Sequence, residues 1–459
     1  VYKAGKTELK KEIILDREEA RVYIRYTLIK APAGTKLRVH PFLSFRNIHS
    51  LSKANGDVSK VHDPVKNGIC TSLYDGYPGL YLQFSHKNEF VAAPDWFYNV
   101  EYQKEKERGY EGQEDLFVPG FFEFDLKKGQ SIVMGAGLTE MTPTSLSRKF
   151  NSEIKKIPSC ENFVQCLEAA SEQFILKQGE DTRIVAGYPW FSETLRETLT
   201  ALPGLLIARN KINTAEAVLD TISDAQAFLS PQEEDASADI ALWYAYTLQQ
   251  YVNQSHRYKR AVSHYWPLLK TLLEAYRDGK MPYANMAENF LLRHNHALVG
   301  LTWMNRTAYG QPVVPRAGFA VEVNALWYNA VKFALELAKH AEDQEFTEAW
   351  AAMPENIQQN FMSLFWSPTA NYLADSVGEG DPDCTVRPNM VFAVSLPYPV
   401  LEDEKAEAVL RIVEEQLLTP LGLRTLSPKA DAFIAQTHGN EHERARGAMQ
   451  GAAWPWLLG

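Results

Sequence analysis

Residues 320–341 read AVEVNALWYNAVKFALELAKHA, and this stretch is the clearest single indicator of the fold. Its apolar residues recur at intervals of three and four, the spacing that places side chains on one face of an α-helix. Further amphipathic stretches with helical spacing are found at 189–209, 214–228, 238–253, 258–276, 343–364 and 403–418. The larger, C-terminal part of the chain is therefore predicted to consist of helices.

The predicted helices are separated by loops rich in Pro, Gly, Asp and Trp. Paired helices of this kind pack either as an open α-solenoid or as a closed α/α toroid. Solenoids of the TPR or ankyrin type repeat their sequence at a fixed period, and no such period is found here. The toroid is favoured, because each of its loops lines one shared cleft and can therefore differ from the others.

The pattern before residue 155 is different, because short runs alternate apolar and polar residues. Residues Arg21–Ile29 follow a period of two, which predicts a strand with one buried face. Residues 80–84 and 120–124 show the same alternating pattern and are bounded by Gly, Pro, Asn and Asp turn residues. Residues 1–155 are therefore predicted to form a mainly β domain.

Charge and composition exclude several classes of partner. The 459 residues include 47 Lys and Arg against 57 Asp and Glu, a formal net charge of −10. Nucleic acid binding requires a concentrated basic face, and an acidic surface disfavours docking on anionic lipid. No stretch approaches the ~20 apolar residues of a membrane helix. We expect neither nucleic acid nor membrane as a partner, and the sequence does not predict an oligomeric state.

The four cysteines show no CxxC spacing and are too few for a disulfide framework, so a reducing, cytoplasmic setting is expected. Motifs for nucleotide, acyl-transfer and zinc-protease chemistry are absent. His294 and His296 alternate, but no pattern for a third ligand accompanies them. We therefore expect no metal and no cofactor.

The tryptophans indicate the class of ligand. Nine of the ten lie after residue 155, and any single one can simply fill the core. Several, however, stand near planar polar groups, as Trp190 does near Arg196 and Trp303 beside Asn305. A pyranose has an apolar face and a ring of hydroxyls, which such pairs suit. Carbohydrate is therefore favoured over nucleotide or lipid.

Carboxylates are the plausible chemical groups for acting on a sugar. Glycoside hydrolysis needs one protonated carboxyl to assist the leaving oxygen and one ionised carboxyl to activate water. The acids of the helical part that qualify are Glu193, Glu197, Asp235, Asp239, Glu322, Asp375 and Asp383. Composition alone does not choose among them, since most acids on a net-acidic protein are simply solvated.

Several segments of the helical part share a recognisable pattern. They are AGYPWF (Ala186–Phe191), GLTWMN (Gly300–Asn305), PRAG (Pro315–Gly318), VEVNALWYN (Val321–Asn329), VRPN (Val386–Asn389), LLTPLGLRTLSP (Leu417–Pro428) and QGAAWPWL (Gln450–Leu457). In this order, over residues 184–458, they resemble prokaryotic glycogen debranching enzymes of the amylo-α-1,6-glucosidase family. Residues 1–155 resemble the tail of that family's N-terminal β domain, with less specific support from Pro94–Trp96 and Val118–Gly120.

The resemblance implies an α+β multidomain fold. The C-terminal part of a β sandwich-like domain is expected over 1–155, a linker helix over 156–185, and a six-hairpin α/α barrel, or toroid, of catalytic type over 186–459. The family continues past the segment that ends at Leu457. The chain is therefore expected to be either a fragment, truncated at both ends and with an incomplete barrel, or a protein that has lost part of its barrel.

The activity that the resemblance implies is hydrolysis of α-1,6-linked glucose at branch points of glycogen or limit dextrin. An inverting mechanism is expected, which requires two carboxyls about 6.5–9.5 Å apart. The family's general acid corresponds to Asn305, an amide that cannot donate a proton as an acid does. Glu197 replaces an Asp of the family and is a surrogate candidate, as is Glu322. Met449 stands where the family has His, and the base is expected in the family's continuation.

A set of glucan-binding residues is also implied: Trp190, Arg196, Asp239, Trp243, Trp303, Arg316, Asn324, Trp327, Arg387 and Asn389. Each has a structural alternative. Asp239 matches a barrel-loop acid of the family, but Asp is also a favoured helix N-cap. Arg316 and Arg387 either clamp a sugar or pair with Glu322 and Asp383. The tryptophans either stack on the sugar or pack in the core.

Two functional classes stay open on the sequence alone, and with them whether the chain is an enzyme. A debranching glucosidase, or its catalytic fragment, is favoured by the retained Asp239, Glu322, Arg387 and Asn389. A non-catalytic glucan-binding relative or an inactive fragment is favoured by Asn305. Both have glycogen or a maltodextrin-type α-glucan as partner. A helical scaffold for a protein partner is disfavoured by the tryptophans gathered in loops.

Overall fold

The computed structural model describes residues 1–16, 18–158, 160–178, 181–188, 191–230, 237–294 and 300–458. Their contacts form two compact units, Val1–Ala170 and Ser171–Gly459, called here the β-rich unit and the helical unit. Within the described ranges, every helix is too short or too polar to span a bilayer.

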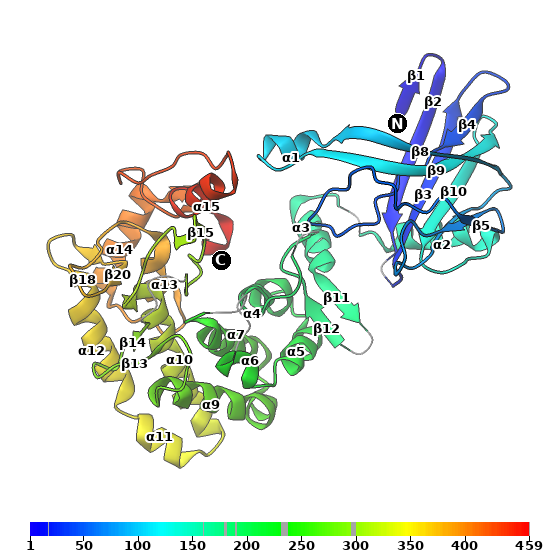
Figure 1. Cartoon of the computed structure of the whole chain (residues 1–459). Coiled ribbons are helices and arrows are strands. Elements are labelled where there is room, and N and C mark those ends of the chain that lie inside the picture. Colours follow the sequence, from blue (N-terminus) through cyan, green and yellow to red (C-terminus); the bar gives the residue numbers. More distant parts are fainter. Residues whose placement is uncertain are drawn as a thin grey trace. The chain divides into compact units, whose positions relative to one another are not determined.

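The β-rich unit contains two antiparallel sheets (Figure 1). The strands of the larger sheet are β1 (Tyr2–Ala4), β2 (Thr7–Leu15), β3 (Arg21–Lys30), β5 (His62–Val65), β6 (Gly68–Thr71), β7 (Leu80–Phe84) and β10 (Ser131–Gly137). Their order across the sheet is β1-β2-β3-β10-β7-β6-β5. The smaller sheet has the order β4-β9-β8, with β4 at Lys36–Val39, β9 at Gln113–Asp125 and β8 at Glu89–Glu101.

The apolar alternation of the strands places a core between the two sheets. Phe84 of the larger sheet packs on Phe122 and Phe124 of the smaller one, with ring centroids 4.7 and 4.8 Å apart. Helix α2 (Pro143–Lys156) covers the opposite face of the larger sheet, where Phe150 contributes to a second cluster. The predicted β-rich N-terminal region is thereby confirmed.

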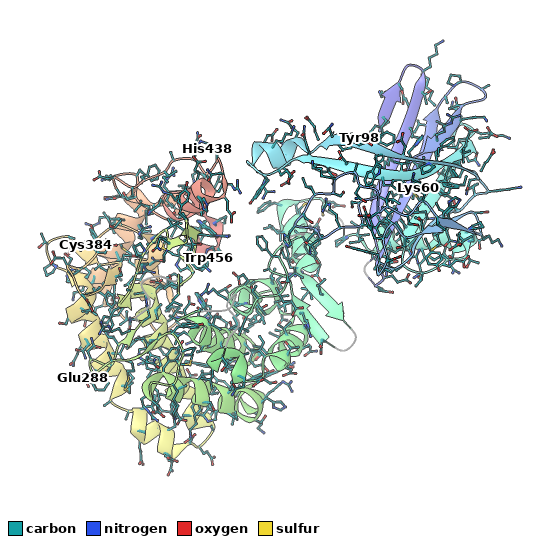
Figure 2. All side chains as sticks on the ribbon, viewed as in Figure 1. Lys60, Tyr98, Glu288, Cys384, His438 and Trp456 are labelled. Carbon is teal, nitrogen blue, oxygen red and sulfur yellow. The ribbon has the colours of Figure 1, made fainter. Side chains whose placement is uncertain are left out.

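One hairpin of the smaller sheet is much longer than the others. Strands β8 and β9 continue past the sheet, and the short helix α1 (Gln103–Glu107) lies at their tip (Figure 1). Most of β8 is exposed, and Tyr98 projects from it into solvent (Figure 2).

The helical unit consists of helices joined by loops and short two- or three-stranded ribbons (Figure 1). The helices are α4 (Leu195–Leu202), α5 (Ile212–Thr221), α6 (Gln226–Leu229), α7 (Ile240–Ser255), α8 (Tyr258–Arg260), α9 (Trp266–Arg277), α10 (Val321–His340), α11 (Gln344–Trp350), α12 (Met353–Phe365), α13 (Phe392–Ser395), α14 (Asp403–Gln416) and α15 (Glu441–Met449). The segment 156–185, for which a linker helix is expected, holds α3 (Phe163–Ser171), a 3-10 turn and the hairpin of β11 (Ile175–Gln178) and β12 (Asp181–Ile184).

A proline accompanies one difference between predicted and observed helices. The stretch 343–364 forms α11 and α12 rather than one helix, and a proline, Pro354, stands in the first turn of α12. The stretch 258–276 is helical throughout, as predicted, but a π-helical segment (Ala261–Tyr265) lies between α8 and α9, and Pro267 stands in the first turn of α9. Proline fits the start of a helix but not its interior, because it lacks an N–H and clashes with the preceding turn.

Helix α10 is the central element of the helical unit. Every residue from Val321 to Val331 is buried, and α7, α9, α11, α12 and α13 all contact this helix. Trp327 packs against Tyr276 and Trp350, with ring centroids 5.7 and 5.9 Å apart, and donates to a backbone carbonyl. Trp327 therefore packs in the core, which was one of the two alternatives for this tryptophan.

Removal of side-chain volume from α10 is expected to destabilise the helical unit. Leu337 is fully buried, so Leu337→Ala should lower the free energy of unfolding by about 2–5 kcal/mol. The control Leu410→Ala in α14, where the side chain is 49% exposed, should change it by less than about 0.5 kcal/mol. Urea unfolding followed by tryptophan fluorescence measures both. Equal effects of the two substitutions would contradict the central place of α10.

Candidate active site

A cavity of about 680 Å³ is formed within the helical unit by α4, α7, α13, the loop before Arg306 and the C-terminal segment. Its aromatic lining residues are Phe174, Trp243, Tyr246, Trp303, Phe392, Trp454 and Trp456. Its charged and polar lining residues are Arg196, Glu197, Thr200, Asn305, Arg306 and Ser395. The volume lies in the range of small-molecule sites, which are mostly apolar with a few polar groups.

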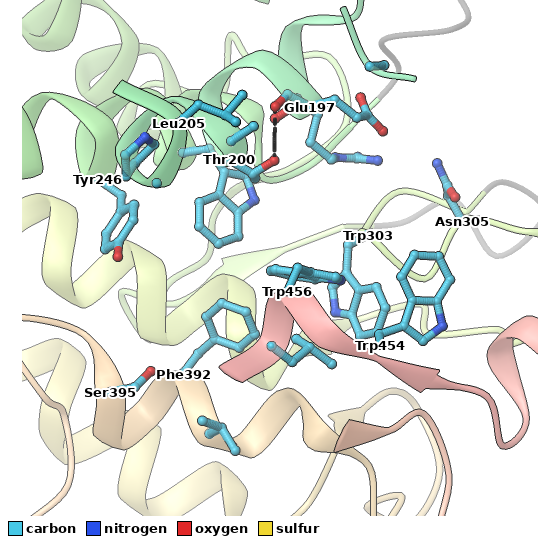
Figure 3. A pocket seen from close by; sticks show the side chains of 18 of the residues that line it. Glu197, Thr200, Leu205, Tyr246, Trp303, Asn305, Phe392, Ser395, Trp454 and Trp456 are labelled. Carbon is cyan, nitrogen blue, oxygen red and sulfur yellow. Dashed lines mark hydrogen bonds between the residues drawn. The ribbon is translucent and has the colours of Figure 1, made fainter. Parts of the chain in front are cut away.

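Five residues predicted from the sequence meet at this cavity: Arg196, Glu197, Trp243, Trp303 and Asn305. In Figure 3, Glu197 approaches from α4, and Trp303, Trp454 and Trp456 gather on the other side with Asn305 beside them. The structure therefore brings two of the three predicted catalytic positions, Glu197 and Asn305, and two of the predicted tryptophans together around one space.

Edge-on contacts between rings build the aromatic wall. The ring centroid of Trp456 lies 5.2 Å from that of Trp303 and 6.2 Å from that of Trp243. Trp454 lies 5.8 Å from Trp303, and Phe392 lies 5.7 Å from Trp243. Edge-to-face packing of this kind restricts the orientation of each ring.

Trp454 and Trp456 were not among the predicted site residues. Both belong to the segment QGAAWPWL, which carries part of the family resemblance. The signal that identifies them was therefore in the sequence. Only the fold shows that this C-terminal segment reaches the same cavity as α4 and α7.

Asp239 lies behind the cavity wall and holds two of its residues. Its Oδ1 accepts from Nε of Arg196 and its Oδ2 from Nε1 of Trp243, both at 3.2 Å. The hydroxyl of Ser237 contacts the same carboxylate. Asp239 is fully buried and is the N-cap residue of α7, but its side chain makes no capping hydrogen bond to the helix. Its contact with sugar stays a prediction.

A buried ion cluster lies behind the other part of the wall. Arg316 binds both carboxylate oxygens of Glu322, with Nη2–Oε2 at 2.6 Å, and its Nε is 2.8 Å from Oδ2 of Asp375. All three side chains are at most 2% exposed. The structure therefore has the pairing of Arg316 with Glu322 that was one of the two alternatives for this arginine.

Burial and charge act in opposite directions within this cluster. Burial raises the pKa of Glu322, and the guanidinium of Arg316 opposes this rise. Burial alone would lower the pKa of Arg316, but the charges of Asp375 and Glu322 raise it. Arg316 thus remains a cation that compensates buried carboxylates.

Asn389 connects the ion cluster to the cavity. Its Nδ2 donates to Oδ1 of Asp375 and its Oδ1 accepts from Nε1 of Trp303, both at 2.7 Å. The predicted residues Trp303, Arg316, Glu322 and Asn389 therefore belong to one continuous network. Among these four, only Trp303 lines the cavity.

Asn324 and Arg387, two further predicted binding residues, do not line the cavity themselves and bond to backbone groups. Asn324 pairs with both backbone groups of Leu292, at 2.7 and 3.1 Å. Arg387 donates to the carbonyls of Thr425 and Met449, both at 3.0 Å, and burial lowers its pKa. Trp190 lies outside the described residues. Sugar contacts of these three residues stay predictions.

Glu197 is the one acid among the described residues that line the cavity. Its side chain is exposed, and the Thr194 hydroxyl donates to its carboxylate. Asn305 and Arg306 are also exposed, so these polar side chains form an accessible rim beside the aromatic wall. In the described part of the chain, no group of three or more His, Cys, Asp or Glu could hold a metal ion.

Removal of the Arg316 guanidinium should lower the free energy of unfolding, because two buried carboxylates then lack a cation. Arg316→Met leaves Glu322 and Asp375 without their cation and should cost about 3–5 kcal/mol of stability. The control Arg293→Met removes an exposed cation 3.8 Å from Glu379 and should cost at most about 1 kcal/mol.

The same substitution predicts a pH dependence. Buried carboxyls without a cation have raised pKa values in the folded state, which favours folding at low pH and is lost as pH rises through those values. The deficit of Arg316→Met relative to wild type should therefore be smaller near pH 5 than near pH 8, as measured by urea unfolding. A deficit that is independent of pH would contradict this description.

Comparisons with known proteins identify the family of the chain. The family described as amylo-alpha-1,6-glucosidase matches residues 169–459, and the family described as glycogen debranching enzyme N terminal matches residues 1–133. The glycogen debranching enzyme of Saccharomyces cerevisiae is 27% identical in a match that covers 34% of this chain and 13% of the yeast protein.

Among solved structures, a bacterial glucoamylase complexed with acarbose is similar with a TM-score of 0.55 and 13% sequence identity. The similarity covers 99% of this chain and 72% of the glucoamylase chain. At this identity it supports the fold alone. The matched family regions cover well over half of the sequence, and the chain therefore belongs to the amylo-alpha-1,6-glucosidase family of glycogen debranching enzymes.

Proposed function

We propose that the protein is a debranching-type α-glucosidase, which binds the end of a branch of glycogen or of a maltodextrin-type α-glucan in the 680 Å³ cavity. The observation that carries this proposal is the combination of an aromatic wall with the polar lining residues Arg196, Glu197 and Asn305. Sugar rings stack on indoles through their apolar faces, and their hydroxyls require donors and acceptors at the edge. Membership of the family favours α-glucan among carbohydrates.

The proposal includes the fold of the helical unit as a six-hairpin α/α toroid. The likeness to a glucoamylase supports this, as does the succession of helices from α4 to α15 (Figure 1). Such an arrangement gathers loops at one end, where differing loop sequences build one cleft. A cytoplasmic setting fits the four free cysteines.

The reaction proposed is hydrolysis of α-1,6-linked glucose by an inverting mechanism with two carboxyls. Glu197 is assigned one of these roles, because it reaches the cavity while Glu322 is bonded to Arg316 behind the wall. The second carboxyl has to come from outside the described lining residues. Asn305 can donate or accept a hydrogen bond to a sugar hydroxyl, and Arg196 can donate one.

A second candidate function is glucan binding without hydrolysis. It is favoured by one observation: Asn305 occupies the position that the resemblance assigns to the general acid, and Glu197 is the only carboxylate that the described lining provides. Such a protein would retain the aromatic wall and the rim hydrogen bonds, but it would release no glucose.

Glucose release from phosphorylase-limit dextrin tests the proposed activity. The wild-type chain is expected to release glucose, and Glu197→Gln should lower the rate by about 10²-fold or more, as expected for loss of a catalytic acid or base. Glu345→Gln is the matched control, since it is also an exposed Glu in the first turn of a helix. Equal rates for wild type and Glu197→Gln would exclude the catalytic role of Glu197.

A binding measurement separates the two candidates. Panose, in which an α-1,6-linked glucose is attached to maltose, should change tryptophan fluorescence in a saturable manner, because indoles line the cavity. Trp456→Ala removes the ring that contacts both Trp243 and Trp303 and should weaken binding about tenfold or more. Binding without glucose release from dextrin supports the second candidate, and absence of binding contradicts both.

A further inference from the structure

The loop Gly300–Asn305 forms the part of the cavity wall that contains Trp303 and Asn305. Its two ends touch: a Cβ atom on Gly300 would come within 2.5 Å of the Cα of Asn305. Because the loop closes on itself in this way, a displacement of Trp303 would also move Asn305. The position of the cavity rim therefore depends on what holds the centre of the loop.

Consecutive residues of this loop are held from behind the cavity. The backbone N–H of Ala238 donates to the carbonyl of Leu301 at 2.8 Å, and Arg316 donates to the hydroxyl of Thr302 at 3.3 Å. At the next two positions, Asn389 contacts both Trp303 and Met304. Asn389 is thus the residue that holds the centre of the loop.

Both the oxygen and the nitrogen of the Asn389 amide make hydrogen bonds. Its oxygen accepts from the indole N–H of Trp303 at 2.7 Å, and its nitrogen donates to Asp375 at 2.7 Å and lies 3.3 Å from the sulfur of Met304. Asn389 is fully buried, and Asp375 is in turn held by Arg316 at 2.8 Å. Water cannot replace these bonds easily in such a place, so the amide has one favourable orientation.

We propose that Asn389 is a positioning residue, which fixes the Trp303 indole and, through it, the place of the Gly300–Asn305 loop on the cavity wall. It acts from behind the wall and does not touch the ligand. The part of this proposal that concerns the Trp303 indole rests on the hydrogen bonds alone. The part that concerns glucan affinity rests on the proposed function.

A spectroscopic test addresses the indole directly. Near-UV circular dichroism of a tryptophan requires a fixed environment, and subtraction of the Trp303→Phe spectrum from that of wild type isolates the Trp303 contribution. The same subtraction in the Asn389→Leu background should give a band with most of its amplitude lost. An unchanged Trp303 band would overturn the proposal, whether or not the protein binds any glucan.

The matched control is Asn329→Leu. Asn329 is also a buried Asn of the helical unit, and its amide bonds to Gln249 at 2.8 Å and to the backbone of Tyr398 at 3.1 Å. Asn329→Leu should therefore destabilise the folded protein about as much as Asn389→Leu does. The Trp303 band and panose affinity of the folded protein should nevertheless remain those of wild type. A general effect of lost stability would instead weaken the band equally in both variants, and that result would also overturn the proposal.

A double-mutant cycle tests the consequence for binding. Asn389→Leu should raise the Kd for panose about tenfold in the wild-type background and less than about twofold in the Trp303→Phe background. Equal changes in the two backgrounds would show that Asn389 does not act through Trp303. If wild type binds no panose, the proposed function fails, while the spectroscopic test still decides the role of Asn389.

Discussion

The pairing of Arg316 with Glu322 and Asp375 is the interaction on which the cavity wall depends. These residues come from three segments: the loop before β17 (Phe319–Ala320), the first turn of α10, and the segment before β20 (Ser376–Val377). Removal of three charged groups from water is costly unless they compensate one another in good geometry. This charge compensation therefore favours one arrangement of the three segments. Asn389 links that arrangement to the cavity wall, because it bonds to both Asp375 and Trp303.

A second pairing of the same type supports the opposite part of the wall. Arg196 and Asp239 are both buried, and Asp239 binds the indole of Trp243. Two arginine–carboxylate pairs thus orient two tryptophans of one cavity, and Trp456 contacts both rings. The charged groups with the most extensive contacts lie behind the aromatic surface, whereas Glu197 and Asn305 reach the rim. This division of roles suits a site in which indoles contact the sugar rings.

The periodicity of the sequence predicted several elements directly, but it did not predict which distant partners the buried polar side chains bind. Helix α10 and strand β3 follow directly from periods of 3.6 and 2. Asp239 illustrates the limit: its place at the start of a helix suggests either a cap or a ligand, yet it binds Arg196 and Trp243 instead. Trp243 stands four residues on, at the spacing of one helical turn, whereas Arg196 is 43 residues away in the sequence, and a single sequence does not record such a distant partner. Trp454 and Trp456 were overlooked for the same reason.

We propose above that this cavity, whose tryptophans are oriented by buried ion pairs, is the α-glucan site. A crystal structure of the protein soaked with panose would test it most directly. Sugar density is expected against the faces of Trp303 and Trp456, with hydroxyls within hydrogen-bond distance of Arg196 or Glu197. Density for panose elsewhere on the protein, with the cavity occupied only by water, would contradict it.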